Sequence, residues 1–280
     1  MSTRRACAVI GSPIDHSRSP ALHTAAYAEL GLDWRYGRHD VPAGALAEFV
    51  DRVAVTGLDG LPCGGLSVTM PGKSEALARA DHRDPRAVVL GAANTLVPRY
   101  DGAQLTGWSA YNTDVDGIIG AYADHGLRAT AGRHAVVIGA GGTAAAALAA
   151  LQALGCEEVD VVARNPARAS TLVAAGEQLE VVVRVRSWSA IVECAERAEV
   201  LISTVPPGVA DQVAGARFRS DQLVLDAVYA GGSTALLDAV AAGGGTAIGG
   251  VWMLLHQAVE QVRLMTGRRP SVEVMRAALR

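Results

Sequence analysis

Short apolar runs alternate with stretches of helical period along the whole chain. Residues 6–10 are apolar at every position, which is typical of a strand buried on both faces. Residues 143–154 are almost all alanine and leucine, which favours a helix. Repeated strand–helix alternation predicts an α/β protein, and the 280 residues suit two α/β domains better than one core.

The first region, residues 6–105, is predicted to contain both element types. We expect strands at 6–10, 34–39 and 65–69, and helices at 20–30 and 43–53. Ser19 is the expected N-cap of the first helix, Pro20 its first residue and Gly31 its end. Residues 87–92 and 94–97 flank an expected turn or short strand pair.

The second region begins near Asn112 and has a more regular rhythm, which predicts a parallel, doubly wound sheet. Expected strands lie at 134–139, 159–163, 180–185, 199–204 and 223–227. Expected helices lie at 111–125, 143–154, 166–175, 235–242, 249–266 and 271–279. The glycines at 243–245 form an expected flexible joint.

Composition and charge narrow the function classes. The net charge is −3 and no basic stripe stands out, which argues against a nucleic-acid partner. No apolar stretch approaches the ~20 residues of a membrane span, and the apolar run after the N-terminus is too short for a signal peptide. Four dispersed cysteines and scattered histidines predict reduced thiols, no metal site and a cytoplasmic protein.

The sharpest local motif is the sequence Gly139-Ala140-Gly141-Gly142-Thr143-Ala144. It follows an apolar strand and opens a helix. Glycines allow a tight turn and close approach to a pyrophosphate, whose charge meets free N–H groups at the helix start. The motif predicts a Rossmann-type dinucleotide site; a tight turn without a ligand is the alternative.

The end of the next strand distinguishes the two nicotinamide cofactors. Enzymes that use NAD usually place an acid there to hold the ribose 2′-hydroxyl. This chain has Ala163, Arg164, Asn165 and Arg168 instead. A guanidinium suits a 2′-phosphate, so NADP (NADPH) is favoured over NAD, with solvated loop charges as the alternative.

Several further motifs resemble those of the shikimate dehydrogenase family, in the family's order and over almost the whole chain. They are G-S-P-I-D-H-S-R-S-P at 11–20, S-V-T-M-P-G-K at 67–73, G-A-A-N-T at 91–95, N-T-D at 112–114 and G-V-W-M-L-L-H-Q at 250–257. The resemblance implies reversible, NADP-dependent reduction of 3-dehydroshikimate to shikimate, in the shikimate pathway of aromatic amino-acid biosynthesis. It leaves monomer and homodimer open.

The resemblance also implies the roles of particular residues. Lys73 and Asp114 would form the catalytic proton-transfer pair, with hydride transfer at C3 of the substrate. The implied substrate contacts are Ser17, Ser19, Ser67, Thr69, Lys73, Asn94, Asp114, Tyr229 and Gln257. Further implied cofactor contacts are Thr204, Val205, Pro206, Val228, Gly250 and Met253. The implied domains are a discontinuous substrate domain, 1–112 plus 249–280, and a cofactor domain, 113–248, joined by long helices.

Some positions depart from the family pattern. Ser67 stands where the family usually has asparagine, Thr24 where an asparagine is expected, and Tyr111 precedes the Asn-Thr-Asp triplet. A quinate or quinate/shikimate dehydrogenase is therefore an alternative, although Ser19 and the absence of an acid beside Arg164 speak against it. A non-catalytic relative is disfavoured because Lys73 and Asp114 are both present. The serine loop does not fit a methylene-tetrahydrofolate dehydrogenase.

Overall fold

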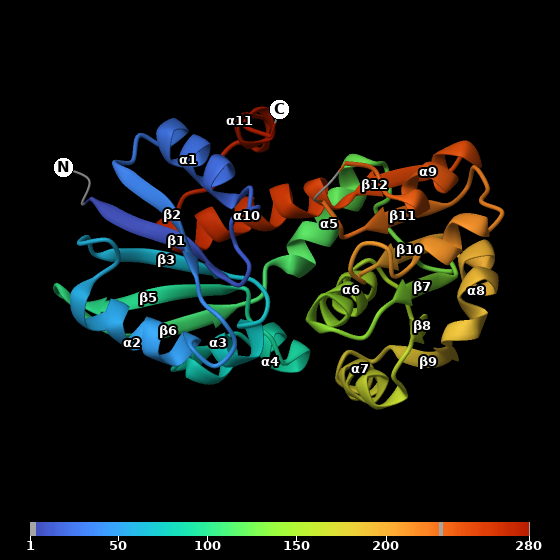
Figure 1. The fold of residues 1–280 in the computed structure, drawn as a ribbon, viewed down its shortest axis with the longest axis horizontal. Coiled ribbons are helices and arrows are strands. Elements are labelled where there is room, and N and C mark those ends of the chain that lie inside the picture. Colours follow the sequence, from blue (N-terminus) through green and yellow to red (C-terminus); the bar gives the residue numbers. More distant parts are fainter. Residues whose placement is uncertain (1–3, 230–231, 280) are drawn as a thin grey trace. The chain divides into compact units, whose positions relative to one another are not determined.

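The computed structural model describes residues 4–229 and 232–279, without the side chains of Pro166 and Arg168, and is drawn in Figure 1. Its contacts divide into two compact units. The first contains the chain up to Thr113 and from Leu255 onward, and the second contains Asp114–Leu254. The second boundary falls within the last long helix, whereas the sequence analysis expects it before that helix.

The first unit is built on a six-stranded mixed sheet with the order β2-β1-β3-β5-β6-β4. Strands β1, β2 and β3 are parallel, β5 and β6 form an antiparallel pair, and β5 runs antiparallel to β3. The strands are β1 (Arg5–Gly11), β2 (Trp34–Asp40), β3 (Cys63–Val68), β4 (His82–Arg83), β5 (Thr95–Asp101) and β6 (Gln104–Tyr111). The carboxyl ends of β1 and β3 therefore lie at the same edge as the start of β5.

Helices cover both faces of this sheet. The helices α2 and α3 lie on one face, and α1, α11 and the second half of α10 lie on the other (Figure 1). The helices are α1 (Ser19–Glu29), α2 (Leu46–Thr56), α3 (Lys73–Arg79), α4 (Pro85–Leu90), α10 (Gly250–Thr266) and α11 (Val272–Ala277). Phe49 of α2 and Trp108 of β6 are buried in the core between α2 and the sheet.

The second unit contains a six-stranded, wholly parallel sheet with the order β12-β11-β10-β7-β8-β9. Counted from β7, this is the strand order of a Rossmann fold, with the switch point between β7 and β10. The strands are β7 (Ala135–Ile138), β8 (Glu158–Ala163), β9 (Val182–Ser187), β10 (Val200–Ser203), β11 (Leu223–Asp226) and β12 (Thr246–Gly249). The predicted doubly wound sheet is confirmed.

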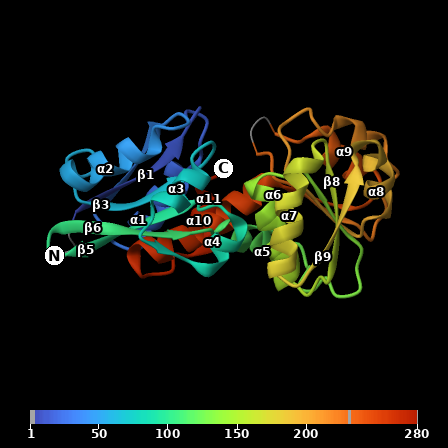
Figure 2. The ribbon, with the colours of Figure 1, turned by 90° about the horizontal axis from the view of Figure 1, so that it is seen from below.

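The helices of the second unit also cover both faces of its sheet. Figure 2 shows α6 and α7 on one side and α8 and α9 on the other. The helices are α5 (Asp114–Asp124), α6 (Gly142–Ala153), α7 (Pro166–Gln178), α8 (Ile191–Arg197) and α9 (Ala235–Ala242), with the short 3-10 turns Trp188–Ala190 and Asp211–Gly215. Tyr122 is fully buried, and its hydroxyl donates to the carbonyl of Leu201, 2.9 Å away, which ties α5 to β10.

The turn expected between residues 87–92 and 94–97 is present, but residues 85–90 before it form the helix α4. Asp84 accepts from the N–H groups of Arg86 and Ala87 and caps this helix, which begins with Pro85. Two other local predictions are wrong. Arg18, and not Ser19, is the N-cap of α1. The glycines at 243–245 form a tight turn between α9 and β12, where a Cβ on Gly243 would lie 2.6 Å from the carbonyl oxygen of Phe218.

The four cysteines, Cys7, Cys63, Cys156 and Cys194, are buried free thiols. Burial raises the pKa of the Cys7 thiol to about 12. Among the helices that the structure describes, none combines the length and apolarity needed to cross a bilayer.

Candidate active site

Two loops meet at the carboxyl edge of the first sheet. The N–H of Ser12, just after β1, donates to the carbonyl of Met70, just after β3, at 3.0 Å. Gly11 makes this approach possible, because a Cβ there would lie 2.5 Å from the Met70 carbonyl oxygen and its φ is +158°. The loop that carries Ser17 and Ser19 is therefore fixed beside the loop that leads to Lys73.

The serine loop, which carries Ser17 and Ser19, is held by hydrogen bonds within the loop and by an arginine of β2. Ser17 and Ser19 are both buried, and the N–H of Ser19 donates to Ser17 Oγ at 3.4 Å. Arg38 of β2 donates from Nε and Nη2 to the Ser17 carbonyl, at 3.0 and 2.6 Å. This two-pronged contact orients the loop, and the sequence analysis does not anticipate Arg38.

Lys73 and Thr113, the residue before Asp114, are both hydrogen-bonded to the segment Ala93-Asn94. Lys73 is the partly buried first residue of α3, and its carbonyl accepts from the N–H of Ala93 at 2.9 Å. The next residue, Asn94, accepts from the N–H of Thr113 at 2.8 Å and donates from Nδ2 to Thr113 Oγ1 at 3.1 Å. Asp114 follows Thr113 as the buried first residue of α5.

The remaining predicted substrate residues fall in both units. Ser67 and Thr69 lie at the end of β3 and just after it, and Gln257 is buried on the part of α10 that belongs to the first unit. Tyr229 belongs to the second unit and is partly buried. The first unit thus gathers at its carboxyl edge a set of predicted residues: Ser17, Ser19, Ser67, Thr69, Lys73 and Asn94.

In the second unit the glycine turn joins β7 to α6 as predicted. Gly139 has φ +119°, and a Cβ there would lie 2.3 Å from Thr204 Oγ1. The hydroxyl of Thr204 is itself held by the carbonyl of Ile138, 2.9 Å away. Gly141 is the N-cap of α6, has an extended backbone and is exposed, so the first N–H groups of a twelve-residue helix face the turn.

The loop after β8 carries the predicted phosphate-binding arginine. Arg164 is exposed, and its guanidinium carbon lies 5.6 Å from the centre of the Trp188 ring. Stacking restricts the side chain while leaving the edge of the guanidinium available for hydrogen bonds. Asn165 caps α7 by accepting from the N–H of Ala167 at 2.9 Å. The Arg168 side chain lies outside the described residues.

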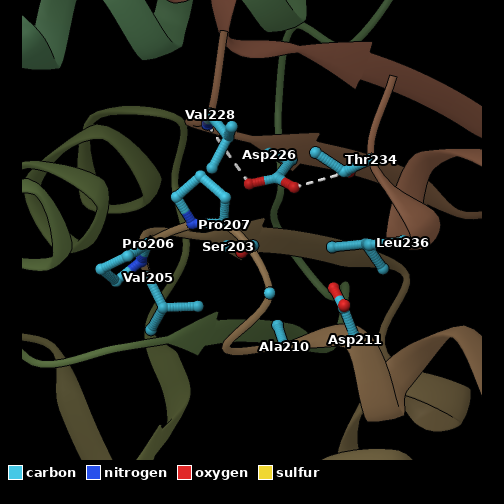
Figure 3. A pocket seen from close by; sticks show the side chains of 11 residues that line it. Ser203, Val205, Pro206, Pro207, Ala210, Asp211, Asp226, Val228, Thr234 and Leu236 are labelled. Carbon is cyan, nitrogen blue, oxygen red and sulfur yellow. Dashed lines mark hydrogen bonds between the residues drawn. The ribbon is translucent and has the colours of Figure 1, made fainter. Parts of the chain in front are cut away.

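A small pocket opens beyond the carboxyl ends of β10 and β11 (Figure 3). Three predicted cofactor residues line it, namely Val205, Pro206 and Val228. Asp226 stands among them and accepts from Thr234 Oγ1 at 2.8 Å and from the Val228 N–H at 3.3 Å. Burial raises the pKa of this carboxyl group, and those hydrogen bonds oppose the shift.

Gly250, at the start of α10, donates its N–H to the Val228 carbonyl at 3.2 Å. Met253 lies on the same helix within the second unit and is buried. The contact places Gly250, a predicted cofactor residue, beside the loop that follows β11.

Three polar residues of the site are not selected by the sequence motifs. They are Arg38 and Asp226, described above, and Gln261 of α10, whose Oε1 accepts from Ser67 Oγ at 2.7 Å. Gln261 alone carried a local signal, because it lies four residues after Gln257 and so on the same face of the helix.

Models of three protein families match most of the chain. The shikimate dehydrogenase substrate-binding domain matches residues 9–96, shikimate/quinate 5-dehydrogenase matches 121–207, and the shikimate 5'-dehydrogenase C-terminal domain matches 250–280. The first match lies in the first unit, the second match lies in the second unit, and the third match belongs to the first unit from Leu255 onward.

Individual relatives align over nearly their whole length. An NADP(+) shikimate dehydrogenase of Rubrobacter xylanophilus is 38% identical over 97% of this chain and 94% of its own. The crystal structure of Mycobacterium tuberculosis shikimate dehydrogenase is 42% identical, with a TM-score of 0.84 and 98% of each chain covered. A quinate dehydrogenase from Corynebacterium glutamicum, solved in complex with NAD, is 28% identical with a TM-score of 0.84, covering 99% of this chain and 98% of that one.

Proposed function

The chain belongs to the shikimate dehydrogenase family and is an NADP-dependent oxidoreductase, and from that premise we propose that Lys73 and Asp114 move the proton in the reversible reduction of 3-dehydroshikimate to shikimate. The observation that carries this proposal is the hydrogen-bonded link through Ala93 and Asn94. That link fixes both the start of α3 and the residue before Asp114.

The composition of the chain supports the role of Lys73 independently. Lys73 is the only lysine among the 25 basic residues, and all the others are arginine. Arginine remains protonated in proteins, whereas lysine can lose its proton. The one side chain of this class that can act as a general base therefore stands at the start of α3.

In the oxidation of shikimate, the neutral Nζ of Lys73 accepts the proton of the C3 hydroxyl as the carbon–hydrogen bond breaks. In the reverse direction the Lys73 ammonium returns that proton to the ketone oxygen. The Asp114 carboxylate stabilises the ammonium, and its place in the first turn of α5 suits a negative charge. Bound NADP supplies the hydride acceptor, and NADPH the hydride donor.

The remaining predicted residues bind and orient the two ligands. The hydroxyls of Ser17 and Ser19 bind the carboxylate of the substrate together with Tyr229, while Ser67, Thr69, Asn94 and Gln257 bind ring hydroxyls. The N–H groups at the start of α6 bind the pyrophosphate, and Arg164 binds the 2′-phosphate. The discontinuous domain that holds the substrate corresponds to the first unit, and the cofactor domain to the second.

Quinate is the alternative substrate, because one matching family model covers both substrates and one similar structure is a quinate dehydrogenase. Purified protein is assayed with each pair of shikimate or quinate and NADP or NAD, following the absorbance of the reduced cofactor. We expect the highest kcat/KM with shikimate and NADP. A higher kcat/KM with quinate and NAD contradicts the proposed preference, and no turnover with any pair contradicts the catalytic role.

Replacing Arg164 by alanine is expected to raise KM for NADP about tenfold, since a charge-assisted hydrogen bond to the 2′-phosphate is lost. The KM for NAD should stay unchanged because NAD lacks that phosphate. Steady-state kinetics of Arg164→Ala with both cofactors make the measurement. Arg128→Ala, which removes another exposed arginine of the second unit, is the control. An equal rise of both KM values is the result that excludes this role.

A further inference from the structure

A buried polar network joins β3, α1 and α10 within the first unit. Ser67 Oγ accepts from the hydroxyl of Tyr36 at 2.6 Å and donates to Gln261 Oε1 at 2.7 Å. Ser67 is 4% exposed and Gln261 only 1%. The serine that departs from the family pattern is therefore held by two side chains from outside its own motif.

Gln261 uses every hydrogen-bonding position of its amide. Its Oε1 faces Ser67 and, at 3.2 Å, Nε2 of His23. Its Nε2 donates to the Asn94 carbonyl and to Thr95 Oγ1, each at 3.1 Å. A carbonyl can only accept, so the NH₂ group must face Asn94 and the amide oxygen must face Ser67. The orientation of the amide is thus determined by its surroundings.

His23 reinforces the same orientation. It is fully buried and stacks on Tyr36 with ring centres 3.9 Å apart. Burial lowers the pKa of His23 to about 3, so the ring is neutral near pH 7 and carries one N–H. That hydrogen lies on Nε2, because the amide oxygen of Gln261 accepts from it.

The orientation of the Gln261 amide determines which partner donates and which accepts in the hydrogen bonds of Ser67 and Thr95. Because the Ser67 O–H is committed to Gln261, only a lone pair of Ser67 remains for a ligand. Thr95 Oγ1 accepts from Gln261 and donates to Asn94 Oδ1 at 2.8 Å. The orientation of the Asn94 amide does not depend on Gln261, because Oδ1 also accepts from the backbone N–H of Thr113 at 2.8 Å.

We propose that Gln261 is a positioning residue for substrate selection, which makes Ser67 a hydrogen-bond acceptor towards the ring hydroxyls of the substrate. This inference rests on the proposed function, in which Ser67 contacts those hydroxyls. A ligand with a donor facing Ser67 is favoured, and a ligand lacking that hydroxyl is discriminated against.

The test compares shikimate with 4-deoxyshikimate and 5-deoxyshikimate in the wild type and in Gln261→Met, which keeps the length of the side chain but removes its hydrogen bonds. We expect KM for shikimate to rise about five- to tenfold, with kcat and KM for NADP almost unchanged. We also expect the preference for shikimate over at least one deoxy analogue to shrink by a similar factor, because the Ser67 hydroxyl is no longer oriented.

Gln222→Met is the matched control. Gln222 is also 1% exposed and its amide is also used, accepting from the Arg219 N–H and donating to the Ala195 carbonyl, but it belongs to the second unit. This variant should lose thermal stability without any change in the preference between shikimate and its analogues. Because Gln261→Met also loses stability, the preference is the readout that a merely structural role does not move.

Ser67→Ala serves as a second variant that keeps the test valid where Gln261→Met does not fold. It should reduce the preference for shikimate over the same deoxy analogue. Unchanged preferences in whichever of these variants fold overturn the inference. If the wild type fails to turn over shikimate with NADP, the proposed function itself fails, and the two outcomes are distinguishable.

Discussion

Replacing Lys73 by methionine is expected to lower kcat for shikimate oxidation by about 10²- to 10⁴-fold, the range that a general base contributes. Methionine is similar in length to lysine but cannot accept a proton. The binding of NADP should be almost unchanged, because the glycine turn and Arg164 belong to the second unit. Steady-state rates with both ligands saturating, together with the Kd of NADP, make the measurement.

Ser74→Ala is the control for Lys73→Met. Ser74 is the exposed neighbour of Lys73 in α3 and has no role in the proposed proton transfer. It should keep kcat near the wild-type value. A Lys73→Met protein that turns over shikimate at a comparable rate would falsify the assignment of the base.

Replacing Gly141 by alanine is expected to weaken NADP binding more than tenfold without lowering the melting temperature, because the pyrophosphate must approach the backbone at this position. In the protein alone a Cβ on Gly141 meets no atom within 4 Å, and the backbone of Gly141 is extended. An alanine is therefore compatible with the fold, and its methyl group interferes only with a ligand. The Kd of NADP and the melting temperature are measured on the same samples.

Gly215→Ala is matched to Gly141→Ala, since a Cβ on Gly215 also meets nothing within 4 Å. It should leave both NADP affinity and melting temperature unchanged. Gly139→Ala gives a useful contrast, because its Cβ would collide with Thr204 Oγ1 and the fold itself should lose stability. Unaltered NADP affinity in Gly141→Ala would place the pyrophosphate elsewhere.

Much of the fold could be predicted from local pattern, because buried parallel strands and Ala-rich helices leave clear signals. The strand β7, the glycine turn and α6 follow the prediction within a residue or two. By contrast, no expectation existed for β6, in which polar residues and a glycine separate the apolar ones, or for the seven-residue helices α3 and α8. Short elements contain too few residues for their period to stand out.

The residues of the candidate site also fall into two groups, those that the sequence could indicate and those that it could not. Residues within motifs, such as Lys73 and Gly139, could be selected from the sequence because their neighbours indicate a loop or a turn. Gln261 and Arg38 are not selected, because their importance depends on partners 194 and 21 residues away, respectively. The position of Gln261 four residues after Gln257 indicates only a shared helix face, and hydrogen bonds between distant segments depend on the fold.

The most direct test of the central claim is kcat for shikimate oxidation in Lys73→Arg, measured with both ligands saturating. Arginine keeps a positive charge at position 73 but does not release its proton in proteins. If Lys73 transfers the proton, Lys73→Arg should be about as inactive as Lys73→Met, at least ~10²-fold below the wild type. A kcat within a few-fold of the wild type would show that only a positive charge is needed there, and would contradict the proton-transfer role of Lys73.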